Sequence, residues 1–479
     1  MSKRKERMVL SAAPADSERP IDGTRSLELL GVLELLFKHL TPALCRKVYA
    51  RTRLTERERK WTFEAIVSFW MAMIVRQPSS LTQGVVQTRR RGADREAMWP
   101  EVRAEVNAFF EKCAALRADF FKNLYLSFTE SLLADAPESY ASWLRPLRER
   151  FPNIIVVDGS VLDAVQHKLK LLWAVRETVL PGQLSVFYDL FRGVTRHVAF
   201  CPDAHTSEFK RFEEEIDWIP AGSLVMGDRL YGVPRIFETL ASRGLQGLFR
   251  RNRTPNLKVV RMLDCRRAGR DFLDDALVAF GGGRYGRPAI TVRRIRWRSR
   301  GRSLDLVTSV LDPAVLSAEQ AVALYGQRWS IERMFLDLKK TLKLHGIYGS
   351  HPNLVAQQLY ATAIVYNAFR VAQARLSIQG EVLPEQLSPE KLFPVLARSS
   401  SDWAVSQLTM TGVRQANPGV RLSEPDWRRM GFAWIRLADI IAKHRRGRIK
   451  PPRRPGNGGR WKSFAQLAGG KKLLRHVSN

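Results

Sequence analysis

Hydrophobic residues recur with helical spacing over the first third of the chain. In KWTFEAIVSFWMAMIV (60–75) and in the long run that begins at Val102, apolar residues lie three and four positions apart, as on one face of a helix. Basic residues cluster between such segments, notably Arg89, Arg90 and Arg91. The pattern predicts a helical domain with basic corners that would suit contact with DNA, although a solvated loop is the alternative for any single cluster.

The pattern changes near residue 153, where short apolar runs replace helical periodicity. NIIVVDGS (153–160) is apolar and β-branched up to Asp158, and SLVMGDRLYG is a second short run that reaches Asp228. Such runs are typical of strands buried on both faces of a sheet. Helical segments that begin with Pro or end at Gly, such as VPRIFETLASRG, alternate with them. The sequence therefore predicts an α/β core with the two aspartates at the ends of buried strands.

Two further changes of pattern follow. Residues 254–313 alternate polar and apolar positions and are punctuated by glycines, which predicts strands. Helical spacing returns in YGQRWSIERMFLDLKK (325–340) and again in LVAQQLYATAIVYNAFRVAQARL. Residues 444–462 are basic and rich in Pro and Gly, so they cannot build a core. That segment either follows a phosphate backbone or acts as a solubilising tail.

The first of those helices carries an unusual polar edge. On one ideal helix, Tyr325, Arg328, Glu332 and Lys339 fall within an arc of about 60°, beside an apolar stripe that would face a core. One interpretation is a solvated face with an Arg328–Glu332 pair worth a few tenths of a kcal/mol. The other is the wall of a cleft that binds DNA, in which Arg328 and Lys339 would bind phosphates. Tyr325 would stack on a base or bond a phosphate oxygen.

Charge favours a nucleic acid as the partner. The chain has 78 basic and 47 acidic residues among 479, a net charge of +31. So large a charge repels itself unless a polyanion binds it. An anionic membrane is the weaker alternative, because no amphipathic or lipidated anchor and no membrane-spanning run is present. The basic N-terminus is not followed by an apolar signal core. We therefore expect a soluble intracellular protein.

The four cysteines lie far apart and lack the spacing of a zinc site. We expect them to be buried thiols in a reducing compartment.

The carboxylates suggest a metal-dependent reaction. In an open α/β sheet, ligands collect at the ends of strands such as those that carry Asp158 and Asp228, and Glu332 on the later helix could face the same point. Three convergent carboxylates are costly unless cations neutralise them. Two Mg²⁺ ions about 4 Å apart, or Mn²⁺ in their place, would do so and would cleave a phosphodiester. Each aspartate could instead cap the turn or helix that follows it.

The chain resembles the DDE transposases of bacterial insertion sequences, in particular insertion sequence family four. That group carries a Y-x2-R-x3-E-x6-K signature, which Tyr325, Arg328, Glu332 and Lys339 match at every spacing. VVDGSVLD and GDRLYG are similar to the regions around that family's first and second aspartates. The likeness covers roughly residues 150 to 375.

The resemblance implies an RNase H-like core with Asp158, Asp228 and Glu332 as its catalytic, metal-binding residues. A β-strand insertion before the last helix would explain the long gap between Asp228 and Glu332. Trp297 is a candidate to stack on a flipped base, although a buried or cross-strand Trp is the alternative. The resulting division is a disordered basic tail (1–24), a helical DNA-binding domain (25–150), the first part of the core (151–253), the β insertion (254–313), the last part of the core (314–378) and a helical and basic C-terminal region (379–479).

The activity implied is cut-and-paste transposition. The protein would bind terminal inverted repeats of double-stranded DNA, pair two ends as a homodimer, cut a strand to leave a 3′-OH and join that end to target DNA. We expect it in the bacterial cytoplasm, associated with the nucleoid. Two alternatives remain: a catalytically inactive DNA-binding repressor or domesticated relative, and a structure-selective RNase H-like nuclease that does not join strands.

Overall fold

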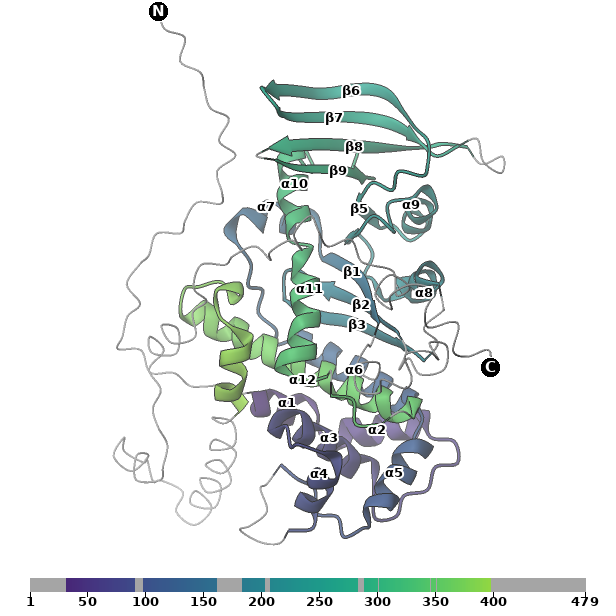
Figure 1. The fold of residues 1–479 in the computed structure, drawn as a ribbon, viewed down its shortest axis with the longest axis vertical. Coiled ribbons are helices and arrows are strands. Elements are labelled where there is room, and N and C mark those ends of the chain that lie inside the picture. The colour runs from purple at the N-terminus through teal and green to yellow at the C-terminus, as the bar shows by residue number, and fades with distance from the viewer. Residues whose placement is uncertain are drawn as a thin grey trace, which may run out of the picture.

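The structure is a computed structural model that describes residues 32–90, 98–161, 183–202, 207–282, 288–299, 301–344, 346–349 and 351–397. The predicted N-terminal tail, Arg91 and all of the C-terminal region beyond residue 397 lie outside the described residues. In Figure 1 the described part is elongated, with helices at one end and strands at the other. The boundaries of the six predicted domains stay a prediction.

Helices dominate the N-terminal part, as the periodicity predicts. They are α1 (Val32–His39), α2 (Pro42–Thr52), α3 (Phe63–Arg76), α4 (Leu81–Thr88), α5 (Val106–Ala115), α6 (Ala118–Leu133) and α7 (Arg145–Arg150). The hydroxyls of Thr62 and Ser80 accept hydrogen bonds from backbone N–H groups in the first turns of α3 and α4. Such caps satisfy donors that a helix start leaves without a partner.

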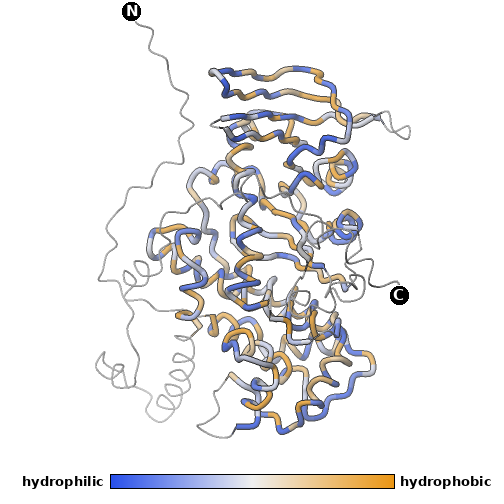
Figure 2. The backbone as a smooth tube through the Cα atoms, in the orientation of Figure 1, coloured by the Kyte–Doolittle hydropathy of each residue, from blue (hydrophilic) through white to orange (hydrophobic). Residues whose placement is uncertain are grey.

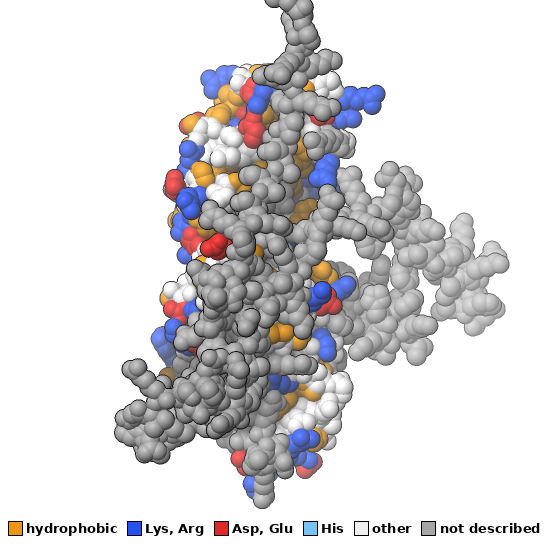
Figure 3. All heavy atoms as spheres, turned by 90° about the vertical axis from the view of Figure 1, so that its left-hand side faces the viewer, with side chains coloured by type: hydrophobic (Ala, Val, Ile, Leu, Met, Phe, Trp, Pro, Cys, Tyr) orange, Lys and Arg blue, Asp and Glu red, His pale blue; other side chains and the backbone are white. Residues whose placement is uncertain are grey.

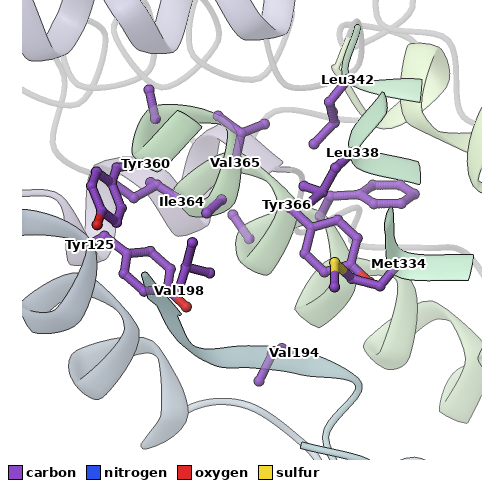
Figure 4. Packing of buried hydrophobic residues seen from close by; sticks show 14 of the residues in the cluster. Tyr125, Val194, Val198, Met334, Leu338, Leu342, Tyr360, Ile364, Val365 and Tyr366 are labelled. Atoms are coloured by element: carbon purple, nitrogen blue, oxygen red, sulfur yellow. The ribbon is translucent and has the colours of Figure 1, made fainter. Parts of the chain in front are cut away.

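The long helix α12 (Pro352–Gln379) joins these helices to the sheet. It contacts α3, α6 and β3, and nearly all of its side chains are buried. Buried polar groups fix its position: Trp70 donates to Gln357 at 3.2 Å, and Asn367 accepts from the Thr195 backbone at 2.9 Å. Figure 4 shows Tyr125 and Tyr360 packed side by side in this core. None of the helices in the described part of the chain is both long and apolar enough to cross a membrane.

Five neighbouring strands of one larger sheet form the centre of the molecule. They are β1 (Ile154–Val161), β2 (Gln183–Asp189), β3 (Val194–Cys201), β4 (Leu224–Gly227) and β5 (Gln246–Arg250), in the order β3-β2-β1-β4-β5. β1, β2 and β3 pair antiparallel, whereas β1, β4 and β5 pair parallel. This is the order of an RNase H-like core, so the predicted α/β class is confirmed.

Side chains alternate between the two faces of this sheet. Ile154 and Val156 join the hydrophobic cluster that includes α12, and Ile155 and Val157 join a second cluster that includes residues of α8 (Glu208–Glu215) and α9 (Pro234–Ala241). Figure 2 shows hydrophobic positions along the central strands and within the surrounding helices. Burial on both faces explains why these strands read as continuous apolar runs.

Four more strands continue the same sheet. They are β6 (Leu257–Ala268), β7 (Asp271–Phe280), β8 (Ile290–Ser299) and β9 (Arg302–Thr308), and β9 pairs antiparallel with β5. They lie within the stretch for which the sequence predicts strands. The Arg293 guanidinium is fully buried between them, where it donates to both oxygens of Asp275 at 2.7 and 2.5 Å and to the Leu316 carbonyl at 2.6 Å. This contact ties the outer strands to the segment that begins α10 (Ala318–Gly326).

Two sequence-based expectations are wrong. The predicted helix over 325–340 is broken into α10, α11 (Trp329–Leu336) and a π-helical turn (Asp337–Thr341). Gly326, a poor helix former, ends α10, and i to i−3 hydrogen bonds tighten the next turn. The cysteines are also not all buried, since Cys201 is half-buried and Cys265 is exposed. Cys265 lies on β6, the outermost strand, where most side chains face solvent.

Candidate active site

The two aspartates lie at matching positions on neighbouring strands. Parallel pairing of β1 with β4 ends at Val156 opposite Met226, and Asp158 and Asp228 each follow two residues later. Asp228 comes directly after β4, as expected. Asp158 does not end its strand, because β1 continues to Val161 by pairing with β2. By alternation, both aspartates extend the rows of side chains that face α11 and α12.

Asp158 lies in an environment that disfavours its charge. Its side chain is 23% exposed, and burial raises the pKa of its carboxyl to about 7. The negative charges of Glu208 and Asp228 also raise this pKa, while the Gly159 N–H, which donates to Asp158 Oδ1 at 2.9 Å, and the Arg328 guanidinium lower it. Burial, more than the neighbouring charges, therefore disfavours the ionised carboxylate, which a bound cation would stabilise.

Glu208 is an acidic residue at this site that sequence reasoning left unassigned. Its carboxyl lies over Gly159, and a Cβ atom on that glycine would come within 3.2 Å of it. The hydroxyl of the buried Tyr231 donates to Glu208 Oε1 at 2.6 Å. Burial raises the pKa of Glu208, and Asp228 raises it further. The sequence signal is weak, because SEFKRFEEE reads as a solvated helix face and only the glycine after Asp158 hints at a close approach.

Arg328 links Glu332 to Asp158. On α11, Glu332 Oε1 accepts a hydrogen bond from Arg328 Nη2 at 2.6 Å, and Arg328 Nη1 lies 3.8 Å from Asp158 Oδ2. Tyr325, at the end of α10, is buried, and that burial raises its pKa to about 12. Lys339 lies in the π-helical turn beyond α11 and is half-buried. The broken helix thus still brings Tyr325, Arg328 and Glu332 to the side of the sheet that carries Asp158.

The carboxylates at this site suit a hard divalent cation. The groups are carboxylate oxygens, which Mg²⁺ and Mn²⁺ prefer, and burial raises the pKa of both Asp158 and Glu208. Within the described ranges, however, no three His, Cys, Asp or Glu side chains are close enough to hold a metal ion in this arrangement. The Arg328 guanidinium stands between Asp158 and Glu332 instead.

A large cationic pocket adjoins the site. It has a volume of about 800 Å³. Half of its lining residues are arginines, and the lining comprises Arg229, Arg250, Arg251, Asn252, Arg253, Thr254, Phe272, Arg294, Arg296, Ser303, Leu304 and Asp305. Asp305 binds the Arg294 guanidinium through two hydrogen bonds of 2.7 Å. The pocket lies where β5 meets β7, β8 and β9, so no single stretch of sequence reveals it.

The remaining residues predicted to bind DNA have mixed surroundings. Trp297 lies on the face of β8 opposite Arg294 and Arg296, and it is partly buried against the hydrophobic core. Arg89 and Arg90 are both exposed. Arg89 donates to the Ala104 carbonyl at 3.0 and 2.7 Å, so it holds the loop that contains Ala104. On the face shown in Figure 3, basic side chains are spread along the described part and interspersed with acidic ones.

Comparisons with known proteins point to one kind of domain. Residues 149–368 match the protein family described as "Transposase DDE domain". Over 126 residues the chain is 36% identical to "Putative transposase y4zB" of Sinorhizobium fredii (strain NBRC 101917 / NGR234), a match that covers 25% of this chain and 34% of that protein. The chain thus spans about a third of that relative's length. Both findings support a DDE transposase; membership of insertion sequence family four stays a prediction.

One solved structure is similar over most of the chain. It is described as "Cryo-EM structure of piggyBac transposase synaptic complex with hairpin DNA (SNHP)", and the match covers 90% of this chain and 87% of that chain. Identity is 10% and the TM-score is 0.41.

Proposed function

We propose that the chain is a DNA transposase that binds terminal inverted repeats, cleaves DNA strands and joins the cut ends to target DNA. The observation that carries the proposal is the placement of Asp158 and Asp228 at matching positions on adjacent strands, with Glu332 linked to Asp158 through Arg328. The family match over residues 149–368 includes all three carboxylates.

The carboxylates would bind the cofactor. Asp158 and Asp228, with Glu332 once Arg328 has moved, would hold Mg²⁺ ions, for which Mn²⁺ can substitute. When bound, divalent ions supply Lewis-acid activation of the attacking oxygen and stabilise negative charge at phosphorus. Because burial raises the pKa of Asp158 to about 7, this carboxyl is partly protonated near neutral pH and must lose its proton to act as a ligand.

The cationic pocket would hold the DNA next to the carboxylates. A B-DNA duplex is far too wide to enter a volume of about 800 Å³, so the pocket would take the phosphates of one strand at its edge. Arginine suits this role because its planar guanidinium bonds phosphate oxygens in pairs. Arg229 directly follows Asp228 and lines the pocket, so it would lie near the reacting phosphate. Exposed arginines elsewhere, including Arg90, would add salt-sensitive affinity for the backbone.

A strand-joining assay tests the proposal. The substrate is a labelled plasmid that carries the gene for this chain with the flanking DNA on both sides, incubated with a supercoiled target and Mg²⁺. The proposal predicts cleaved ends and then joined products, and predicts that Asp158→Asn yields neither while it still binds the DNA. Asp217→Asn, at a carboxylate that is 74% exposed and paired with Arg243, is the matched control and should keep both activities.

The alternatives give different results. An inactive DNA-binding repressor would bind without cleavage, and a structure-selective nuclease would cleave without joining. Full cleavage by Asp158→Asn would contradict the site assignment itself. Pairing of two ends by a homodimer and association with the bacterial nucleoid follow from the proposed activity and are part of the proposal.

A further inference from the structure

Arg328 occupies a position between two carboxylates of the proposed metal site. Its Nη2 donates to Glu332 Oε1 at 2.6 Å, and its Nη1 lies 3.8 Å from Asp158 Oδ2. The side chain is only 17% exposed, so water screens these contacts weakly. A guanidinium in this position neutralises the same oxygens that a divalent ion would use.

The backbone sets this position. Arg328 lies in the tight turn between α10 and α11, where its N–H donates to the Tyr325 carbonyl at 3.1 Å and its own carbonyl accepts from the Ile331 N–H at 3.2 Å. The guanidinium also lies 5.7 Å from the centre of the Trp329 ring. α11 packs against β1, as Figure 1 shows, so the break in the helix holds Arg328 over Asp158.

We propose that Arg328 is an internal counter-ion, which stands in for the metal while the protein is free of DNA and must leave Asp158 and Glu332 before the metal site is complete. This inference rests on the proposed function, since it concerns the regulation of the same site. It accounts for two observations together: the carboxylates converge on one cation, yet no three acidic side chains among the described residues are arranged to hold a metal.

DNA phosphate is the group that would displace Arg328 from the carboxylates. A phosphate presents several oxygens that a guanidinium can bond in pairs, and Arg328 would keep a partner after it leaves Glu332. The cationic pocket beside Asp228 would bring the strand to this side of the site. Metal binding and DNA binding would therefore favour each other, and such coupling is reciprocal. The consequence is that the free protein keeps its nuclease site incomplete until DNA is bound.

Metal binding in the absence of DNA tests this inference without measuring activity. Mn²⁺ is titrated into the full chain at low salt, and the concentration of free Mn²⁺ is measured by electron paramagnetic resonance. Arg328→Gln should bind Mn²⁺ about tenfold more tightly than the wild type, a change of about 1.4 kcal/mol. The matched control is Arg333→Gln, which removes the same charge from α11 at a residue that lines a small cavity with Tyr188 and Asp337 instead.

The outcomes are distinct. If Arg328→Gln binds Mn²⁺ no more tightly than Arg333→Gln, including the case in which neither binds it, the inference is wrong. The gain in Arg328→Gln should vanish in the double variant Arg328→Gln, Glu332→Gln. A failure of strand cleavage by the wild type would count against the proposed function, and it would leave the Mn²⁺ comparison intact because that comparison uses no DNA.

Thermal unfolding provides a second readout if Arg328→Gln folds poorly. In EDTA its unfolding midpoint should lie below that of Arg333→Gln, since Asp158 and Glu332 lose their counter-ion. Mn²⁺ should raise the midpoint of Arg328→Gln more than that of the control, because a ligand stabilises the folded state that binds it. An equal effect of Mn²⁺ on both variants would count against the counter-ion role.

Discussion

Replacement of Asp275 by alanine should destabilise the junction between the outer strands and α10. In the wild type, Arg293 is fully buried and bonds both Asp275 oxygens, at 2.7 and 2.5 Å, as well as the Leu316 carbonyl. Asp275→Ala would leave a buried guanidinium with the Leu316 carbonyl as its remaining partner among the contacts described. Removal of one partner from a buried ion pair lowers the free energy of unfolding by about 3–5 kcal/mol.

The chain contains a matched control for this prediction. Glu213 forms the same two-bond contact with Arg235, at 2.7 and 2.6 Å, but the Arg235 side chain is 62% exposed. Exposed pairs of this kind contribute about 0.2–1 kcal/mol. Urea unfolding followed by tryptophan fluorescence should show a much lower midpoint for Asp275→Ala than for Glu213→Ala. Equal midpoints would refute the reasoning, because the two contacts differ mainly in burial.

Two further predictions concern the proposed site. Because burial raises the pKa of Asp158 to about 7 from 3.8, the folded protein holds more protons than the unfolded chain between about pH 4 and pH 7, and its stability should fall as pH rises through that window. Thermal unfolding in EDTA should show that the wild type loses stability relative to Asp158→Asn as pH rises. A difference between their unfolding midpoints that stays constant with pH would contradict the raised pKa. Arg250→Gln, in the cationic pocket, should weaken binding of a DNA strand and lower the slope of log affinity against log salt by about one. The exposed Arg302 at the start of β9 is the control, and an equal loss in Arg302→Gln would show that only total charge matters.

Local sequence patterns are sufficient to predict the central strands and that Asp158 and Asp228 lie on or directly after two of them. The apolar β-branched runs before Asp158 and Asp228 can only be buried on both faces of a sheet, and β1 and β4 are buried in this way. Proline at the start of α9 and the left-handed Gly244 beyond its end likewise mark a helix that the structure contains. These features depend on a few adjacent residues, so they can be read without knowledge of the fold.

Features that depend on contacts between distant segments could not be predicted. Glu208 approaches Gly159 from another element, and the cationic pocket combines arginines from the end of β5 and from β8. The break between α10 and α11 was also missed, because an ideal helical repeat cannot show where i to i−3 bonds replace i to i−4 bonds. As a result, the sequence predicts that Glu332 lies near the aspartates but does not reveal that Arg328 stands between Glu332 and Asp158.

Cleavage by Glu332→Gln is the most direct test of the central claim that three distant carboxylates form one metal-dependent active site. The measurement is Mg²⁺-dependent nicking of labelled DNA that carries the flanks of the gene, with binding of the same DNA measured in parallel. Glu319→Gln is the control, since Glu319 lies on α10, is 37% exposed and pairs with Arg266. Glu332→Gln should bind the DNA but not nick it, while Glu319→Gln should do both. Nicking by Glu332→Gln at the wild-type rate would contradict a role for Glu332 in the active site.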